Sequence, residues 1–161
     1  DHNNIADIMN LTADILKALN IEPILQISNI NIPRLVCGEL NIDIELFKNG
    51  EIATLFKLNC EWLNKLIKVK DIKSLENVIK IVPVSIKAEL EKLLSKAKEV
   101  DYGNIIIAPL YYGALRYYDG IYYRVINDNL TLCNGGVYSS EGISSLGFAL
   151  YTDNLLKILE D

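Results

Sequence analysis

The stretch from Asn104 to Tyr151 constrains the fold more than any other, because it alone has the pattern of successive β-strands separated by turns. It opens with the β-branched run Ile105–Ile107 and continues as an extended segment from Tyr111 to Tyr118. Asp119-Gly120 is a strong hairpin signal, so we expect Ile121–Asn127 to return as the paired strand. The stretch therefore predicts a largely antiparallel sheet.

Two more turns and a final strand complete this region. The turns are expected at Asp128-Asn129 and at Asn134-Gly135-Gly136, since these residue types favour turn conformations. Ser144–Tyr151 is expected as a buried strand, and Thr152 as the N-cap of a closing helix. That helix is expected to bury Leu155, Leu156 and Leu159.

The chain before this region is mostly helical in pattern. Apolar residues at helical spacing run from Ile5 to Leu19, with Asn3 or Asn4 as the N-cap. Residues 24–30 then alternate as a short strand. Short helices are expected from residue 31 to residue 100.

Together these elements predict an α+β protein, a largely antiparallel sheet with helices packed on it. We expect a single domain, or a fragment of one, in three segments: a helix and strand in 1–30, a helical insert in 31–103, and antiparallel strands with a closing helix in 104–161. Within the insert, Pro33 is expected at a first helical position and Ser85 as the N-cap of the last helix.

Composition narrows the class of protein. With 161 residues, 50% of them apolar, the chain can bury a sizeable core. It has no run of about 18 apolar residues that would cross a membrane, and no secretory leader pattern. We therefore expect a cytoplasmic protein. The chain begins without Met and almost directly with helical periodicity, so we expect a piece of a longer protein.

Charge and cysteine usage argue against several kinds of site. The net charge is −5, and the only local basic cluster is Lys65, Lys68, Lys70 and Lys73, which we interpret as a solvated helix face rather than a nucleic-acid surface. Cys37, Cys60 and Cys133 lie far apart without a C-x-x-C pair, and His2 is the one histidine. We expect three buried thiols, no metal site and no cofactor.

No catalytic constellation is visible in the chain, which lacks the common nucleophile, metalloprotease and phosphate-loop motifs. Seven of its nine tyrosines lie between residues 102 and 123, either as cross-strand packing or as the wall of a pocket. Because strand neighbours point to opposite faces, we expect Tyr117 and Tyr118 to face apart, and likewise Tyr122 and Tyr123.

The order of three fragments resembles the second half of the class II catalytic domain of histidyl-tRNA synthetases and of their non-aminoacylating relative, the regulatory subunit of ATP phosphoribosyltransferase. The fragments are Gly113–Gly120, Gly135–Ser140 and Gly147–Leu155. They stand where that family has R-G-L-D-Y-Y-T-G, G-G-R-Y-D-G-L and the motif 3 strand and helix. The resemblance covers nearly the whole chain in order.

Departures from the family motifs bear on function. The family arginine beside the activated histidine falls on Gly113, and the motif 3 arginine that holds ATP phosphate falls on Asn154. A planar, permanently charged guanidinium has no substitute in Gly or Asn. The resemblance therefore implies a protein that is not an enzyme. Two residues of the family's histidine pocket are retained, Tyr118 and Tyr138.

The resemblance implies the C-terminal part of a regulatory subunit of ATP phosphoribosyltransferase in histidine biosynthesis. Such a protein binds the short catalytic subunit, activates it and helps to transmit inhibition by L-histidine. It also implies a homodimer for the full-length protein, with part of the histidine pocket supplied from the upstream half. The alternatives are a divergent histidyl-tRNA synthetase, which would be an enzyme, and a synthetase-like paralogue that binds another amino acid.

Overall fold

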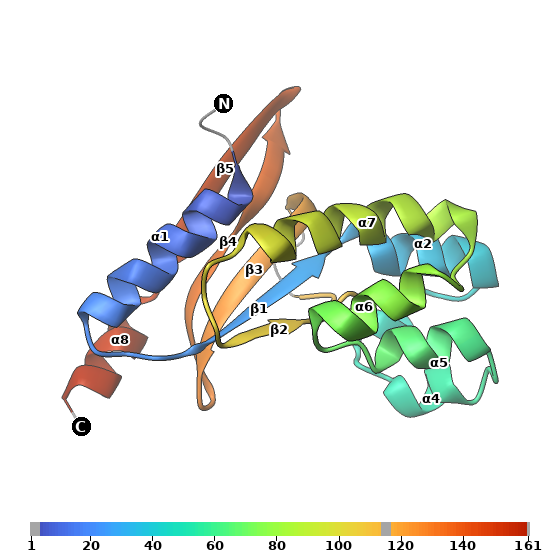
Figure 1. The fold of residues 1–161 in the computed structure, drawn as a ribbon, viewed down its shortest axis with the longest axis horizontal. Coiled ribbons are helices and arrows are strands. Elements are labelled where there is room, and N and C mark those ends of the chain that lie inside the picture. The colour runs from blue at the N-terminus through green and yellow to red at the C-terminus, as the bar shows by residue number, and fades with distance from the viewer. Residues whose placement is uncertain (1–3, 114–116, 161) are drawn as a thin grey trace.

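A computed structural model of the chain describes residues 4–113 and 117–160, in which eight helices and five strands form an α+β fold, as predicted (Figure 1). In chain order the elements are α1 (Ile5–Ala18), β1 (Ile24–Asn29), α2 (Asn31–Leu40), α3 (Glu45–Lys48), α4 (Ile52–Phe56), α5 (Glu61–Ile67), α6 (Ile72–Ile79), α7 (Val84–Glu99), β2 (Ile105–Ile107), β3 (Tyr118–Asn127), β4 (Leu130–Ser140), β5 (Ile143–Leu150) and α8 (Thr152–Leu159).

The five strands form one sheet in the order β2-β1-β3-β4-β5. Only the β1–β2 pair is parallel, and the other three pairs are antiparallel, so the prediction of a largely antiparallel sheet is confirmed. The short strand β2 lies at one edge, as Pro109 just beyond it indicates. Strand β5 lies at the other edge.

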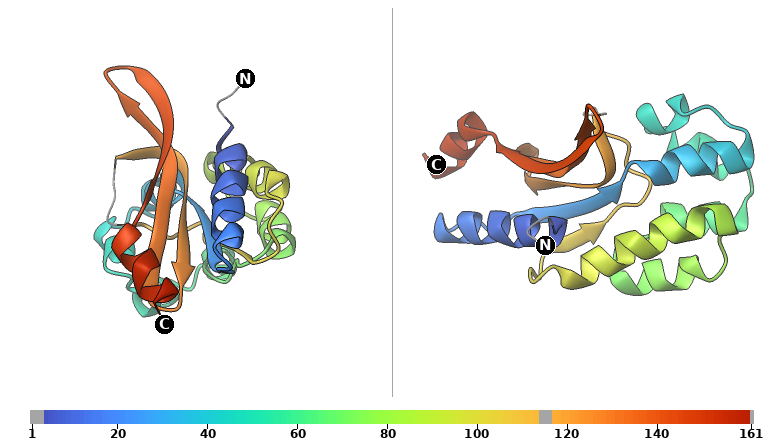
Figure 2. Two further views of the ribbon diagram at one scale, coloured as in Figure 1. Left: turned by 90° about the vertical axis from the view of Figure 1, so that its left-hand side faces the viewer. Right: turned by 90° about the horizontal axis from the view of Figure 1, so that it is seen from above.

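Helix α1 begins as predicted, because the side chain of Asn4 accepts a hydrogen bond from the Ala6 N–H and caps the helix. On its inward face, Met9 and Leu16 are fully buried, whereas Leu19 at the end of the predicted stripe is exposed. Helices α1 and α7 lie along the same side of the sheet (Figure 2). The predicted helical insert is present as α2 to α7, and its main core residues are Leu55, Leu63, Leu66, Leu75, Leu90 and Leu93.

The two faces of the central strands carry separate apolar clusters. On the helix-covered face, Ile121, Tyr123 and Val125 of β3 belong to the main core. On the opposite face, Tyr118 and Tyr122 form a small second cluster with Ile30. Tyr122 and Tyr123 thus point to opposite faces, as predicted.

The hairpin predicted at Asp119-Gly120 is wrong, because both residues lie inside β3. Gly120 has a φ of 108° and lies at a register shift in the pairing with β4, between Tyr118 and Tyr122. It therefore provides a β-bulge rather than a chain reversal. The turn predicted at Asp128-Asn129 is confirmed as the β3–β4 connection, with Asn127 paired to Leu130.

The turn predicted at Asn134-Gly135-Gly136 is also wrong, because these residues lie in the middle of β4. The glycines are there because tyrosine rings cross the strand at this point. A Cβ on Gly135 would lie 2.6 Å from Cζ of Tyr123, and one on Gly136 would lie 2.5 Å from Cδ1 of Tyr118. The chain instead reverses at Glu141-Gly142, where both φ angles are positive.

Three predicted helix positions need correction. Pro33 is the third residue of α2 rather than the first. Ser85 lies inside α7, which Pro83 precedes as N-cap, and its hydroxyl donates to Glu39 Oε2 at 2.7 Å. Thr152 is the first residue of α8 and not its cap.

The last strand and helix are less buried than predicted. Strand β5 is an edge strand without a fully buried residue. In α8, Leu155 is buried, whereas Leu156 and Leu159 are 53% and 50% exposed. The apolar pattern of these residues correctly indicated their secondary structure but not their exposure.

Candidate functional site

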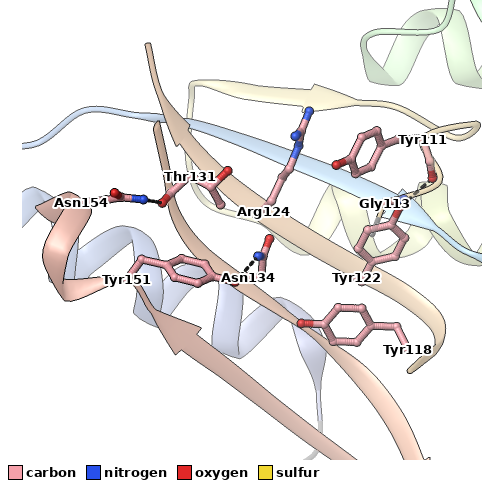
Figure 3. A pocket seen from close by; sticks show the side chains of 9 residues that line it. All are labelled: Tyr111, Gly113, Tyr118, Tyr122, Arg124, Thr131, Asn134, Tyr151 and Asn154. Atoms are coloured by element: carbon pink, nitrogen blue, oxygen red, sulfur yellow. Dashed lines mark hydrogen bonds between the residues drawn. The ribbon is translucent and has the colours of Figure 1, made fainter. Parts of the chain in front are cut away.

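The face of the sheet opposite α1 contains a cavity of about 310 Å³ (Figure 3). It lies over β3 and β4, between the loop before β3 and the start of α8. The residues that line it are Tyr111, Gly113, Tyr118, Tyr122, Arg124, Thr131, Asn134, Tyr151 and Asn154. The cavity therefore contains one predicted site residue, Tyr118, together with Gly113 and Asn154, the two positions onto which the motif comparison places the family arginines.

The tyrosine wall of the cavity depends on the bulge in β3. Tyr118 and Tyr122 are four residues apart on β3 and so face the same side of the sheet. The register shift around Gly120, where four steps along β3 match two along β4, brings them close together. Their rings are almost parallel, with an interplanar angle of 8° and centroids 5.4 Å apart. Gly136 lies beneath them, and any side chain there would meet the Tyr118 ring. Both phenols have a raised pKa, because burial disfavours the charged phenolate, so both remain neutral.

Tyr122 also holds the loop that precedes β3. Its hydroxyl donates to the Tyr111 carbonyl at 2.6 Å and accepts from the Gly113 N–H at 3.3 Å. The Tyr111 ring packs against the Tyr122 ring, with centroids 6.1 Å apart. The position of Gly113 at the cavity is therefore fixed by a side chain of the sheet.

Arg124 is a cavity residue that the sequence prediction missed. Its guanidinium carbon lies 4.1 Å from the centroid of the Tyr111 ring, and Nη2 donates to Gln26 Oε1 at 3.0 Å. The signal was strand alternation, since Arg124 is two residues beyond Tyr122 and so faces the same side. Within residues 4–113 and 117–160, no carboxylate forms an ion pair with it.

The opposite wall is made of neutral polar groups. The Asn134 amide donates to the Tyr151 hydroxyl at 2.7 Å, and the Asn154 amide donates to the Thr131 carbonyl at 2.8 Å. These bonds use the amide nitrogens and leave the two amide oxygens available as acceptors. Figure 3 shows this wall facing the three tyrosines across the cavity.

The second predicted site residue, Tyr138, does not line this cavity. It is paired directly with Tyr118 across β3 and β4, and it lines an adjacent, shallower hollow of about 230 Å³ that Tyr118 shares. Tyr117 lines that hollow as well, with its ring centroid 4.5 Å from that of Tyr118. The prediction that Tyr117 and Tyr118 face apart is wrong, because Tyr117 precedes the strand and alternation does not apply to it.

The remaining sequence predictions concern metal binding, thiols and charge. Among the described residues, no group of His, Cys, Asp and Glu could hold a metal ion. Cys133 is buried as predicted, but Cys37 and Cys60 are only partly buried. The four lysines from Lys65 to Lys73 are exposed, as predicted, but they lie on α5, on α6 and between them rather than on one helix face. His2 and residues 114–116 of the first motif fragment lie outside the described residues.

No helix of the described part is long and apolar enough to cross a membrane.

Comparison with known proteins identifies close relatives of the chain, although no protein-family model matches it. The chain is 36% identical over 149 residues to an ATP phosphoribosyltransferase regulatory subunit from Wolinella succinogenes, covering 92% of this chain and 52% of that protein. It is 35% identical over 156 residues to one from Helicobacter hepaticus, covering 97% and 55%. The chain thus spans about half the length of the curated relatives it matches.

Solved structures share its fold. An ATP phosphoribosyltransferase regulatory subunit/histidyl-tRNA synthetase from Bacillus halodurans matches with a TM-score of 0.70 and 15% identity, over 99% of this chain and 51% of that one. A chain of an ATP phosphoribosyl transferase (HisG:HisZ) complex from Thermotoga maritima matches with a TM-score of 0.53 and 13% identity, over 87% and 58%. The class II synthetase-like fold expected from the motifs is confirmed.

Proposed function

Because this chain is a homologue of ATP phosphoribosyltransferase regulatory subunits over nearly its whole length, we propose that it is part of a regulatory subunit of that enzyme in histidine biosynthesis. The observation that carries the proposal is the identity of more than a third with the Wolinella succinogenes protein across 92% of the chain. The full-length protein would bind the short catalytic subunit in the cytoplasm, activate it and transmit inhibition by L-histidine.

We infer that the protein does not aminoacylate tRNA. Gly113 and Asn154, the positions of the two motif arginines, lie at the same cavity, and neither carries a charge. A triphosphate placed there would have Arg124 as its one cation among the described residues that line the cavity. Without the two motif arginines, the described lining residues leave the phosphates of ATP largely unneutralised, so this cavity is unsuited to adenylate formation.

The cavity supports L-histidine as the ligand. Tyr118 supplies a buried aromatic wall, and the volume of about 310 Å³ is within the range of small-molecule sites. We assign Tyr138 a supporting role, since it is paired with Tyr118 across the strands. The upstream half of the protein would complete the site, and the full-length protein would be a homodimer.

The test is reconstitution of the full-length protein with the catalytic subunit. We expect a complex on size-exclusion chromatography and an increase in phosphoribosyl transfer that L-histidine reverses. No complex and no change in turnover would contradict the proposal. Histidine-dependent ATP–pyrophosphate exchange by the protein alone would instead identify a divergent synthetase. A complex that responds to a different amino acid would identify a paralogue with another effector.

A further inference from the structure

Among the described residues that line the cavity, Arg124 has the only charged side chain. It is partly buried in the sheet, its Nε is fully covered and makes no hydrogen bond, and no carboxylate of the described residues neutralises it. A partly buried cation without a counter-charge is costly unless something supplies one. A cation in this state at the edge of an open cavity indicates an anionic ligand.

The position of the guanidinium is fixed before any ligand arrives. The Tyr111 ring covers one side of it, and Gln26, its direct neighbour on β1, holds Nη2. Gln26 is neutral, so it orients the guanidinium without cancelling its charge. A pre-oriented guanidinium binds a carboxylate with less loss of conformational entropy than a free side chain does.

We propose that Arg124 is the carboxylate anchor of this cavity, and that the ligand is a small α-amino acid with a planar side chain. This inference depends on the proposed function only in the choice of L-histidine as the first ligand to be tested. One guanidinium matches one carboxylate, whereas a polyphosphate carries three or four charges. The amide oxygens of Asn134 and Asn154 can accept from the ligand's ammonium group, and the rings of Tyr118 and Tyr122 pack against its side chain.

This assignment differs from what the motifs alone imply. In the family motifs, the arginines that contact the ligand stand at the positions of Gly113 and Asn154. Gly113 lies on the loop before β3 and Asn154 lies on α8. Arg124 reaches the same cavity from the middle of β3, a position outside all three motif fragments. Positive charge is thus retained in the cavity, but it comes from a different element.

The experiment is calorimetric titration of the full-length protein with L-histidine and with L-histidinol, in which an alcohol replaces the carboxylate. A charge-assisted hydrogen-bond pair supports a preference for L-histidine of about 10- to 100-fold. In Arg124→Gln this preference should fall to about 3-fold or less. Arg124→Lys keeps the positive charge but loses the two parallel N–H donors of the guanidinium, so its preference for L-histidine over L-histidinol should be intermediate.

The control is Arg34→Gln, which removes an exposed arginine on α2 whose one hydrogen bond among the described residues is to Asn31. It should bind like the wild type, and circular dichroism should show that all variants are folded. Equal binding of the two probes by the wild type, an unchanged preference in Arg124→Gln, or no binding of L-histidine, L-phenylalanine or L-tryptophan would each overturn the inference.

The two proposals fail separately. If the complex with the catalytic subunit forms but binding does not depend on Arg124, the anchor is wrong and the regulatory function stands. If binding depends on Arg124 but no complex forms, the anchor stands and the regulatory function is wrong.

Discussion

The two faces of the sheet use the same residue type for different purposes. On the face covered by α1, Tyr123 is fully buried, and its hydroxyl donates to Thr12 Oγ1 at 2.8 Å, since the Thr12 hydroxyl itself donates to the Ile8 carbonyl. On the other face, Tyr118 and Tyr122 pack in a small cluster that borders a cavity. Two tyrosines that are neighbours in sequence, Tyr122 and Tyr123, thus belong to a site and to the core respectively.

The difference follows from what covers each face. Tyr123 is fully buried on the face that α1 covers, whereas Tyr118 borders a cavity that the described helices leave open. Changes on the helix-covered face should therefore reduce stability, and equivalent changes on the cavity face should mainly reduce ligand binding. Paired substitutions on the two faces test this distinction.

Tyr123→Ala should destabilise the protein by about 3–5 kcal/mol, because it leaves a large hole in a closed core. Tyr118→Ala should cost about 1–3 kcal/mol, since its neighbourhood can relax toward the cavity, and it should abolish L-histidine binding. Urea unfolding followed by circular dichroism measures both changes. Equal losses of stability would show that the two faces do not differ in the way proposed.

The glycines beneath the rings offer a second contrast. Gly135→Ala should cost about 2–3 kcal/mol, because the Tyr123 ring has nowhere to move. Gly136→Ala also meets the Cβ of Tyr122, but the Tyr118 ring can swing into the cavity, so we expect about 1–2 kcal/mol and weaker L-histidine binding. The same unfolding and calorimetric measurements apply. Gly103→Ala is the matched control, since a Cβ there has open space.

Alkaline pH should weaken the helix-covered face through Cys133. Burial raises the pKa of its thiol from 9.0 to about 11. The folded state keeps this proton at a pH where the unfolded state has lost it, so stability is full below pH 9 and falls as the pH rises toward 11. The loss amounts to about 2 kcal/mol.

Thermal unfolding between pH 8 and pH 11 tests this expectation. Tyr118, Tyr122 and Tyr123 also have raised pKa values, from an ordinary value of 10.0. Cys133→Ala should therefore not remove the decline but delay its onset by about one pH unit. An unchanged onset would show that the buried thiol does not contribute.

Much of the fold could be predicted from the sequence where local pattern and burial agree. Helix α1, strand β1 and the Asp128-Asn129 turn are examples, since spacing, cap and turn residues all indicate the same structure there. The two wrongly predicted turns fell on glycines. Gly120 and Gly135-Gly136 have the local sequence of turns. In the structure Gly120 forms a bulge, and Gly135 and Gly136 leave room for tyrosine rings of the neighbouring strand, so both roles depend on strand pairing.

The candidate site was predicted only where a motif indicated it. Tyr118, Gly113 and Asn154 were named from motif fragments, and the structure brings them to one cavity. Arg124 was not, because alternation places it on the same face as Tyr122 but no local feature distinguishes a ligand-binding arginine in a strand from a surface one. Its contact with Tyr111 and its pairing with Gln26 join distant parts of the chain.

Removing single tyrosine hydroxyl groups should have the smallest effect on stability, and it should still differ between the two faces. Tyr123→Phe leaves Thr12 without its buried donor and should cost about 1–2 kcal/mol. Tyr151→Phe removes an acceptor from Asn134 at an exposed position, where water can replace it, so the cost should be about 0.5 kcal/mol or less. Both variants keep the ring, so any difference in urea midpoint reports the environment of one hydroxyl. If Tyr151→Phe cost as much as Tyr123→Phe, the cavity face would be as closed to water as the core, and a small ligand could not enter it without local unfolding.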